Sequence, residues 1–192
     1  MSHPEQRRWC LQLKNDFPHF FKNKKVVDFG SLDINGNNRI LFEDCDYTGV
    51  DIGPGPNVDI ISLCHEFPGE ELYDVVCSTE MLEHDMYWEK SLKRMYNLVK
   101  SEGLLFFTCK STGSGEHGTI NREPGSSPWT SLRSDWKFYY KNLSQEDIER
   151  FWGGRLQVIE MFSNYRFSFY KHYEPGDPVL KYMDLQFWGI KT

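Results

Sequence analysis

The sequence predicts an α/β fold, a doubly wound sheet of about seven strands that is mostly parallel, with an antiparallel pair at its C-terminal edge. Apolar strand-like runs alternate with helical patterns through most of the 192 residues, which is typical of a parallel sheet covered on both faces. Residues 104–107 are apolar without a break, as expected of a central strand. Two late strand candidates joined by a short connection predict the antiparallel pair.

The individual elements follow from apolar periodicity and from capping and turn residues. The predicted strands are residues 26–29, 47–52, 58–62, 73–78, 104–109, 156–162 and 184–191. The predicted helices are residues 4–17, 35–42, 85–100 and a helix from the Ser144–Asp147 capping box to Gly153. The helix over 85–100 has the clearest spacing, with Asp85 as its N-cap and Gly103 as a stop. Residues 110–127 read as a loop, and the aromatic run 165–173 is ambiguous.

Length, charge and cysteine content limit the classes of function that this chain can have. The length fits one domain, and the formal net charge is −6 without a basic patch, which disfavours binding to polyanionic nucleic acid. The first nine residues lack the apolar region of a signal peptide, and no apolar stretch is long enough to span a bilayer. The five cysteines form no C-x-x-C pair, so we expect reduced thiols in a cytoplasmic protein and no metal site.

The most informative pattern is a glycine turn between two strands that both end in an acid. The first strand runs into Asp28-Phe29-Gly30, and the second ends in Asp51, 23 positions after Asp28 (51 − 28). A glycine turn lets the backbone approach a nucleotide-like ligand, and an acid at the tip of the next strand suits a ribose diol. The pattern therefore predicts an adenosine-type cofactor.

Two common cofactors carry adenosine at this place, a nicotinamide dinucleotide and S-adenosylmethionine. A dinucleotide needs G-x-G-x-x-G for its pyrophosphate, whereas Gly30 is followed here by Leu32, Asp33 and Ile34. An acid directly before the turn suits a cationic ligand, and S-adenosylmethionine carries an ammonium and a sulfonium but no phosphate. The sequence therefore favours S-adenosylmethionine, and a nicotinamide oxidoreductase is disfavoured.

Taken in order, these segments resemble the motifs of class I (Rossmann-like) S-adenosylmethionine-dependent methyltransferases. The matching segments are residues 26–30, 49–52, 74–84, 98–108 and, for the final strand, 184–190. Each motif alone is weak, but four in order at compatible spacing are specific. The resemblance implies a single methyltransferase domain with an N-terminal helical extension (1–23), a cofactor-binding half (24–109) and an acceptor-side loop with C-terminal strands (110–192).

The resemblance also implies roles for individual residues. Gly30 and the backbone at Ser31 would lie against the methionine part of the cofactor, Asp28 would organise that loop and the ammonium, and Asp51 would accept hydrogen bonds from the ribose. Leu63 stands where the family presents an acid to adenine, which puts that contact in doubt. The residues implied to bind the cofactor are Asp28, Gly30, Ser31, Asp51, Ile52, Leu63, Cys64 and Ser78.

Three residues are candidates for the chemistry. Glu80 and His84 follow the predicted fourth strand, at the edge where ligands bind in such sheets. His84 is either catalytic or a helix-start histidine bonded to backbone. His117, in a glycine-flanked loop, is either a base or acceptor-binding group on a lid, or part of an exposed loop. Four aromatic residues either wall an acceptor pocket or pack structurally: Trp129, Trp136, Tyr139 and Tyr140.

We therefore expect methyl transfer from S-adenosylmethionine to an O or N nucleophile of a small-molecule acceptor. A non-catalytic S-adenosylmethionine-binding module that regulates a partner is the alternative from another class, motivated by the altered glycine loop. A nucleic-acid methyltransferase is disfavoured, because Ser78-Thr79-Glu80 replaces the Asn/Asp-Pro-Pro-Tyr segment that grips a base amino group. The aromatic run 165–173 is either core or the surface of a homodimer.

Overall fold

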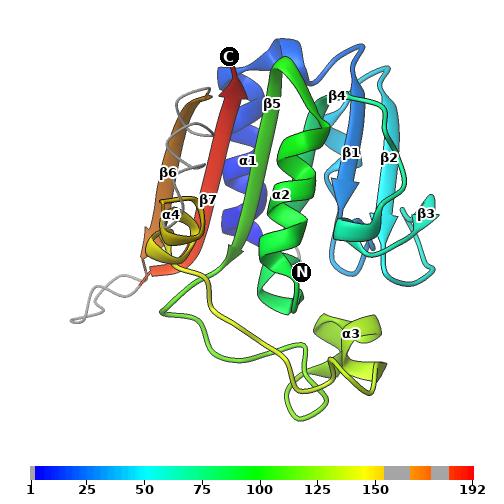
Figure 1. The fold of residues 1–192 in the computed structure, drawn as a ribbon, viewed down its shortest axis with the longest axis vertical. Coiled ribbons are helices and arrows are strands. Elements are labelled where there is room, and N and C mark those ends of the chain that lie inside the picture. The colour runs from blue at the N-terminus through cyan, green and yellow to red at the C-terminus, as the bar shows by residue number, and fades with distance from the viewer. Residues whose placement is uncertain (1–2, 154–164, 174–181) are drawn as a thin grey trace.

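The computed structural model describes residues 3–153, 165–173 and 182–192. Within them a seven-stranded sheet has the order β3-β2-β1-β4-β5-β7-β6 (Figure 1). The strands are β1 (Lys25–Phe29), β2 (Asp46–Asp51), β3 (Ile60–Ile61), β4 (Tyr73–Thr79), β5 (Val99–Lys110), β6 (Tyr165–Tyr173) and β7 (Tyr182–Lys191). The pairs among β1 to β5 are parallel, and β7 is antiparallel to both of its neighbours. The predicted fold class is confirmed.

Helices cover both faces of the sheet, as the apolar strands require. They are α1 (Pro4–Asp16), α2 (Trp88–Leu98), α3 (Pro128–Leu132) and α4 (Gln145–Gly153). In Figure 1, α1 lies behind the sheet, α2 and α4 lie in front, and α3 lies beyond the end to which the parallel strands point. Alternation along β1 divides the core accordingly, because Val27 packs in the cluster that contains Leu92 of α2, whereas Val26 packs with Leu13 of α1.

The helix predicted over residues 35–42 is wrong. The structure has only the 3-10 turn η2 (Arg39–Leu41) there. The side chain of Asp33 explains the difference, since its two carboxylate oxygens accept hydrogen bonds from Gly36 N at 2.7 Å and from Asn37 Nδ2 at 2.6 Å. Such local side-chain bonds give the chain an alternative to helical hydrogen bonding. The connection from β1 to β2 therefore contains no long helix.

The best predicted helix is shorter than expected at both ends. The chain first forms the 3-10 turn η4 (Leu82–His84), and α2 begins at Trp88. Asp85 still acts near the helix start, because its carboxylate accepts from Tyr87 N at 2.7 Å and from Ser91 Oγ at 2.5 Å. At the other end β5 starts at Val99, so the predicted stop at Gly103 lies inside a strand.

The C-terminal hairpin is confirmed, but one of its strands differs from the prediction. The aromatic run of ambiguous character is β6, which pairs with β7 along its length. The strand predicted over 156–162 lies outside the described residues. The capping box is confirmed as well, since Ser144 Oγ accepts from Asp147 N and Asp147 Oδ2 accepts from Ser144 N, both at 3.0 Å. In the described part of the chain, none of the helices has the length and apolar character that a membrane crossing requires.

Candidate active site

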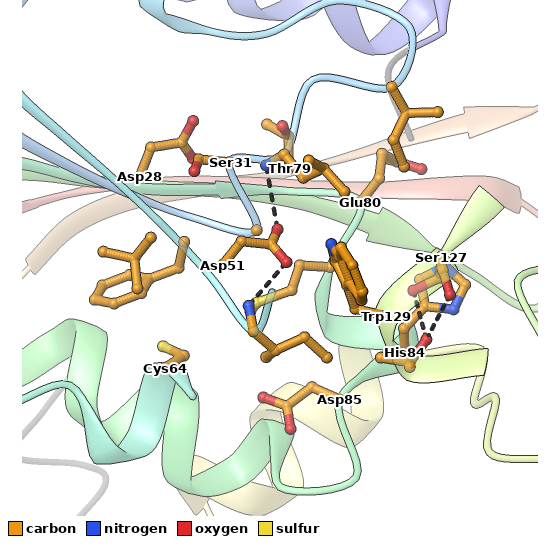
Figure 2. A pocket seen from close by; sticks show the side chains of 18 of the residues that line it. Asp28, Ser31, Asp51, Cys64, Thr79, Glu80, His84, Asp85, Ser127 and Trp129 are labelled. Atoms are coloured by element: carbon orange, nitrogen blue, oxygen red, sulfur yellow. Dashed lines mark hydrogen bonds between the residues drawn. The ribbon is translucent and has the colours of Figure 1, made fainter. Parts of the chain in front are cut away.

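A pocket of about 860 Å³, counting its part open to solvent, lies at the carboxyl ends of β1, β2 and β4 (Figure 2). This is the point where the strand order reverses, because β2 lies on one side of β1 and β4 on the other. Ligands of doubly wound sheets bind at such a switch point. Nine of the residues predicted to bind cofactor or to act in the chemistry line this pocket: Asp28, Gly30, Ser31, Asp51, Ile52, Leu63, Cys64, Glu80 and His84.

The turn after β1 depends on a glycine. Gly30 has φ +78°, and a Cβ atom at this position would lie 2.6 Å from Cβ of Met81. Both the left-handed backbone and the close approach exclude a larger residue. The next residue is held from the other side, because Ser31 Oγ donates to Asn57 O at 3.0 Å and Asn57 Nδ2 donates to Ser31 O at 2.8 Å. The stiff turn after β2 therefore clamps the predicted cofactor loop.

Asp28 presents one unsatisfied oxygen at this turn. The residue is buried, and its Oδ2 accepts from Tyr47 Oη at 2.5 Å and more weakly from Asn38 Nδ2 at 3.4 Å. Oδ1 has no hydrogen-bond partner among the residues that the structure describes. Burial raises the pKa of Asp28 to about 6, although the bond from Tyr47 opposes the rise. A cationic group in the pocket would satisfy Oδ1 and return the carboxyl to its ionised form.

Asp51 lies at the tip of β2 with both carboxylate oxygens oriented by backbone (Figure 2). Oδ1 accepts from Ile52 N at 2.8 Å, and Oδ2 accepts from Leu32 N at 3.1 Å. Burial raises its pKa above the ordinary value, and these amides limit the rise. Each carboxylate oxygen has a second lone pair, so a diol in the pocket can donate to both.

Two predicted cofactor residues take places that the sequence did not indicate. The thiol of Cys64 is buried against α2, where Sγ donates to Ser91 O at 3.7 Å, so only the remainder of this residue faces the pocket. Ser78 lies outside the pocket lining, inside the sheet, and the next residue, Thr79, lines the pocket instead. Alternation along β4 explains the exchange, because neighbouring residues of a strand face opposite sides.

The segment around α3 covers the pocket, and of its residues the sequence indicated only Trp129. Ser126 to Thr130 line the pocket on the side away from β1. The ring of Trp129 lies on the backbone of Gly53, where a Cβ atom would be 2.3 Å from Cδ2 of the ring. Trp129 was a candidate for an acceptor wall, but the structure places it beside the residues that follow Asp51. In the sequence Trp129 is an aromatic residue in a polar segment, a pattern that fits either an acceptor wall or structural packing.

Glu80 is fixed at the pocket wall. It follows β4 with φ 56°, is buried, and its Oε1 accepts from Thr108 Oγ1 at 2.7 Å. On its other side Glu80 Oε2 lies 3.5 Å from His3 Nε2 and 3.6 Å from Lys110 Nζ. Burial acts to raise the pKa of Glu80, but the hydrogen bond from His3 and the charge of Lys110 outweigh it and hold that pKa below its ordinary value. Glu80 therefore carries a negative charge into the site.

The two candidate histidines meet, but only one lines the pocket. His84 is 3% exposed, and burial holds its pKa well below the ordinary value, so its ring is neutral. His117 lies behind it, outside the pocket lining, with ring centroids 5.0 Å apart and planes at 89°. The role of His117 as a base or acceptor-binding group stays a prediction.

A family model and similar solved structures both relate this chain to methyltransferases. A family model described as a methyltransferase domain matches residues 1–162. A search of curated proteins finds no match. Among solved structures, the N-methyltransferase NodS from Bradyrhizobium japonicum is similar with a TM-score of 0.56 and 13% identity over 99% of this chain and 98% of that one.

Two further solved structures are similar at comparable distance. One is 1,6-didemethyltoxoflavin-N1-methyltransferase from Burkholderia thailandensis, crystallised with S-adenosylhomocysteine, with a TM-score of 0.57 and 12% identity over 100% of this chain and 92% of that one. The other is phosphoethanolamine N-methyltransferase 2 from Haemonchus contortus, crystallised with S-adenosylmethionine. Its TM-score is 0.61 at 14% identity, and the match covers 96% of this chain and 52% of that one. At these identities the likeness shows a shared fold.

Proposed function

The chain belongs to the methyltransferase family whose domain model it matches, and from this premise we propose that it transfers a methyl group from S-adenosylmethionine to an O or N nucleophile of a small molecule. The observation that carries the cofactor assignment is the pair of acids at the switch point, of which Asp28 is buried and Asp51 is half-buried. Asp28 offers an oxygen without a partner among the described residues, and Asp51 offers two oriented oxygens. They lie on neighbouring strands, which matches a ligand with an ammonium at one end and a ribose diol further along.

Each residue contributes binding or orientation to the reaction. When bound, S-adenosylmethionine supplies an activated methyl group, which bonds to the lone pair of the acceptor as the carbon–sulfur bond breaks and its electron pair returns to sulfur. Asp28 would accept from the ammonium, Asp51 would accept from the ribose hydroxyls, and Ile52 would pack on adenine. Trp129 would exclude water from above the pocket. Alignment and exclusion of water are the main contributions an enzyme makes to such an in-line displacement.

A small acceptor is the class that the family and the chain favour. The similar solved structures include enzymes named for 1,6-didemethyltoxoflavin and phosphoethanolamine. Nucleic acid remains disfavoured by the net charge of −6. All five cysteines are free in the structure, which fits the cytoplasm as the proposed location. A homodimer remains an expectation.

The first experiment is thermal unfolding with S-adenosylmethionine, S-adenosylhomocysteine and NAD. A ligand at about 100 times its dissociation constant stabilises the folded state by about 2.7 kcal/mol. Stabilisation by both adenosyl compounds and not by NAD is the expected result. No stabilisation by either adenosyl compound would refute the cofactor assignment and leave the interaction module. Binding without turnover on a panel of hydroxyl and amine acceptors would favour a non-catalytic role.

A further inference from the structure

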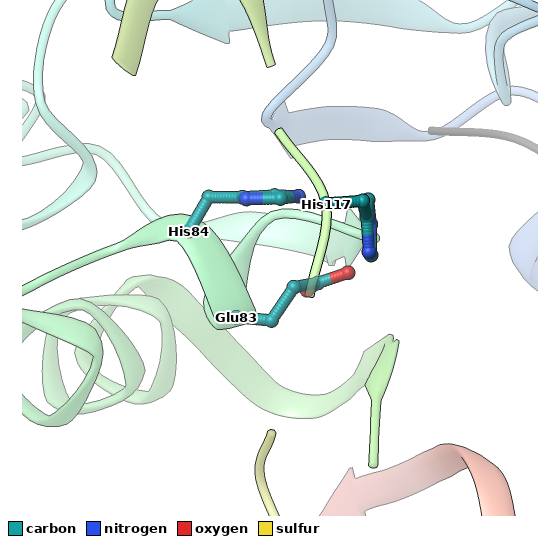
Figure 3. A group of neighbouring side chains, drawn as sticks. All are labelled: Glu83, His84 and His117. Atoms are coloured by element: carbon teal, nitrogen blue, oxygen red, sulfur yellow. The ribbon is translucent and has the colours of Figure 1, made fainter. Parts of the chain in front are cut away.

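A second constellation lies directly behind the pocket. A carboxylate oxygen of Glu83 and one ring nitrogen each of His84 and His117 all lie within 4.8 Å of one another. Figure 3 shows the three side chains converging from two segments, Glu83 and His84 from η4 and His117 from the loop that follows β5. The two segments are 33 positions apart (117 − 84), so local ligand spacing could not indicate this group.

Two members of the group are buried and unsatisfied, and His117 is half-buried. Glu83 is 0% exposed and His84 is 3% exposed. Neither carboxylate oxygen of Glu83 and neither ring nitrogen of His84 has a hydrogen-bond partner within the described part of the chain. A buried carboxyl without a partner is costly in its ionised form, so it is held neutral by a proton unless a cation compensates its charge. Four buried atoms of metal-ligand type on Glu83 and His84 therefore lie at one place without a partner among the described residues.

The lone pairs needed for metal binding are available. His117 Nδ1 lies 3.1 Å from Gly115 O, and because a carbonyl can only accept, Nδ1 carries the proton and Nε2 keeps its lone pair. This is the arrangement in which a backbone carbonyl orients a metal-binding histidine.

The backbone conformation at Gly118 brings the loop that follows β5 into contact with His84. Gly118 has φ +64°, and a Cβ atom there would lie 2.5 Å from Cε1 of the His84 ring. Only glycine permits this conformation and this approach at low cost. The contact fixes His117 and His84 side by side, as a preorganised site requires.

We propose that Glu83, His84 and His117 form a binding site for one divalent transition-metal ion. Two imidazoles and one carboxylate favour an ion such as Zn²⁺ or Fe²⁺ over Mg²⁺ or Ca²⁺, which prefer oxygen ligands. A second possible cluster, His3 with Glu80 and Asp184, is not proposed. There Lys110 Nζ already lies 2.6 Å from Asp184 Oδ1 and 3.6 Å from Glu80 Oε2, so a cation is present.

The ion would act on the acceptor side of the pocket, an inference that rests on the proposed function. His84 lines the pocket, so an ion held by this group would lie next to the pocket. A hydroxyl that coordinates a divalent ion has a lowered pKa and releases its proton to solvent near neutral pH. The oxygen lone pair then bonds to the methyl carbon while the carbon–sulfur electron pair returns to sulfur. The site therefore favours an acceptor with a metal-binding hydroxyl.

The test measures metal binding without cofactor or turnover. The chelator-treated protein is titrated with Zn²⁺ by calorimetry and with Co²⁺ by visible absorption. We expect one ion per chain and an absorption typical of nitrogen and oxygen ligands. Glu83→Gln and His117→Asn should each weaken binding by more than the roughly 10- to 100-fold that loss of an outer-shell partner costs. The matched control His3→Gln removes a histidine from the second cluster and should bind as the unmodified protein does.

The outcomes separate this inference from the proposed function. No ion bound, unchanged affinity in both site variants, or loss of the ion in His3→Gln would each overturn the metal site. S-adenosylhomocysteine binding by the same variants shows that they fold. If the ion binds and S-adenosylhomocysteine does not, the proposed function fails and the metal site stands. Acetohydroxamate, a bidentate oxygen ligand, should alter the Co²⁺ spectrum; an unchanged spectrum would exclude coordination of an acceptor oxygen.

Discussion

Replacing Asp28 with asparagine should stabilise the unliganded protein at neutral pH and weaken cofactor binding in the same step. The ordinary pKa of 3.8 is raised to about 6 in the folded chain by burial. Below about pH 4 the carboxyl of Asp28 is protonated in both the folded and the unfolded chain. Between pH 4 and pH 6 the unfolded chain releases this proton and the folded chain keeps it, so stability falls as the pH rises. The rise in the pKa of Asp28 from 3.8 to about 6 corresponds to a loss of about 3 kcal/mol in the free energy of unfolding above pH 6.

Asparagine cannot ionise, so Asp28→Asn should escape this loss. Relative to the unmodified protein, its free energy of unfolding should improve by up to about 3 kcal/mol between pH 4 and pH 7.5. A partial gain is expected because Tyr47 loses a charged acceptor. The affinity for S-adenosylhomocysteine should fall about 10- to 100-fold, as expected for one hydrogen bond to a charged group.

The assay is urea unfolding at several pH values, with calorimetric titration of S-adenosylhomocysteine at pH 7.5. Asp46→Asn is the matched control, because it makes the same change at an exposed position of β2. Parallel pH curves for Asp28→Asn and the unmodified protein would show that the carboxyl is not perturbed. Unchanged affinity for the ligand would show that Asp28 does not meet the ammonium.

Four further changes test the site and the fold. Asp51→Asn should weaken S-adenosylhomocysteine binding about 10- to 100-fold in calorimetry, because the ribose loses a charged acceptor, and unchanged affinity would remove Asp51 from the site. Gly53→Val should displace the ring of Trp129, shifting its fluorescence toward that of an exposed indole and lowering the same affinity; an unshifted spectrum would contradict the close contact. Leu92→Ala, fully buried in α2, should cost about 2–5 kcal/mol in urea unfolding, and a cost below 1 kcal/mol would argue against this packing. Ser144→Ala should cost about 1 kcal/mol through loss of the cap on α4, whereas no change would mean that the capping box does not stabilise the helix.

The central strands and the position of the candidate cofactor pocket could be predicted from the sequence because both depend on short-range patterns. A strand buried on both faces is apolar along its length, so β1, β4 and β5 were visible as runs. The parallel order places their carboxyl ends together, and Asp28 and Asp51 therefore meet at the switch point.

Side-chain chemistry outside the regular pattern was harder to predict. The expected helix over 35–42 fails because Asp33 binds the backbone and side chain of the next turn instead. The aromatic run of β6 has no clear period, so only its pairing with β7 decides that it is a strand. Ser78 and Thr79 exchange places because the facing of a strand residue depends on one step of register.

The sequence by itself determined the fold class, the glycine turn and the two acids of the candidate cofactor site, since each is a local feature that the topology brings to one edge. Only the tertiary structure placed Trp129 on Gly53 and brought His117 against His84 and Glu83. Both depend on the course of the long connection after β5 across the end of the sheet. Local propensity and periodicity act over a few residues, whereas such contacts are fixed by how whole segments pack, and no pattern along the chain records them.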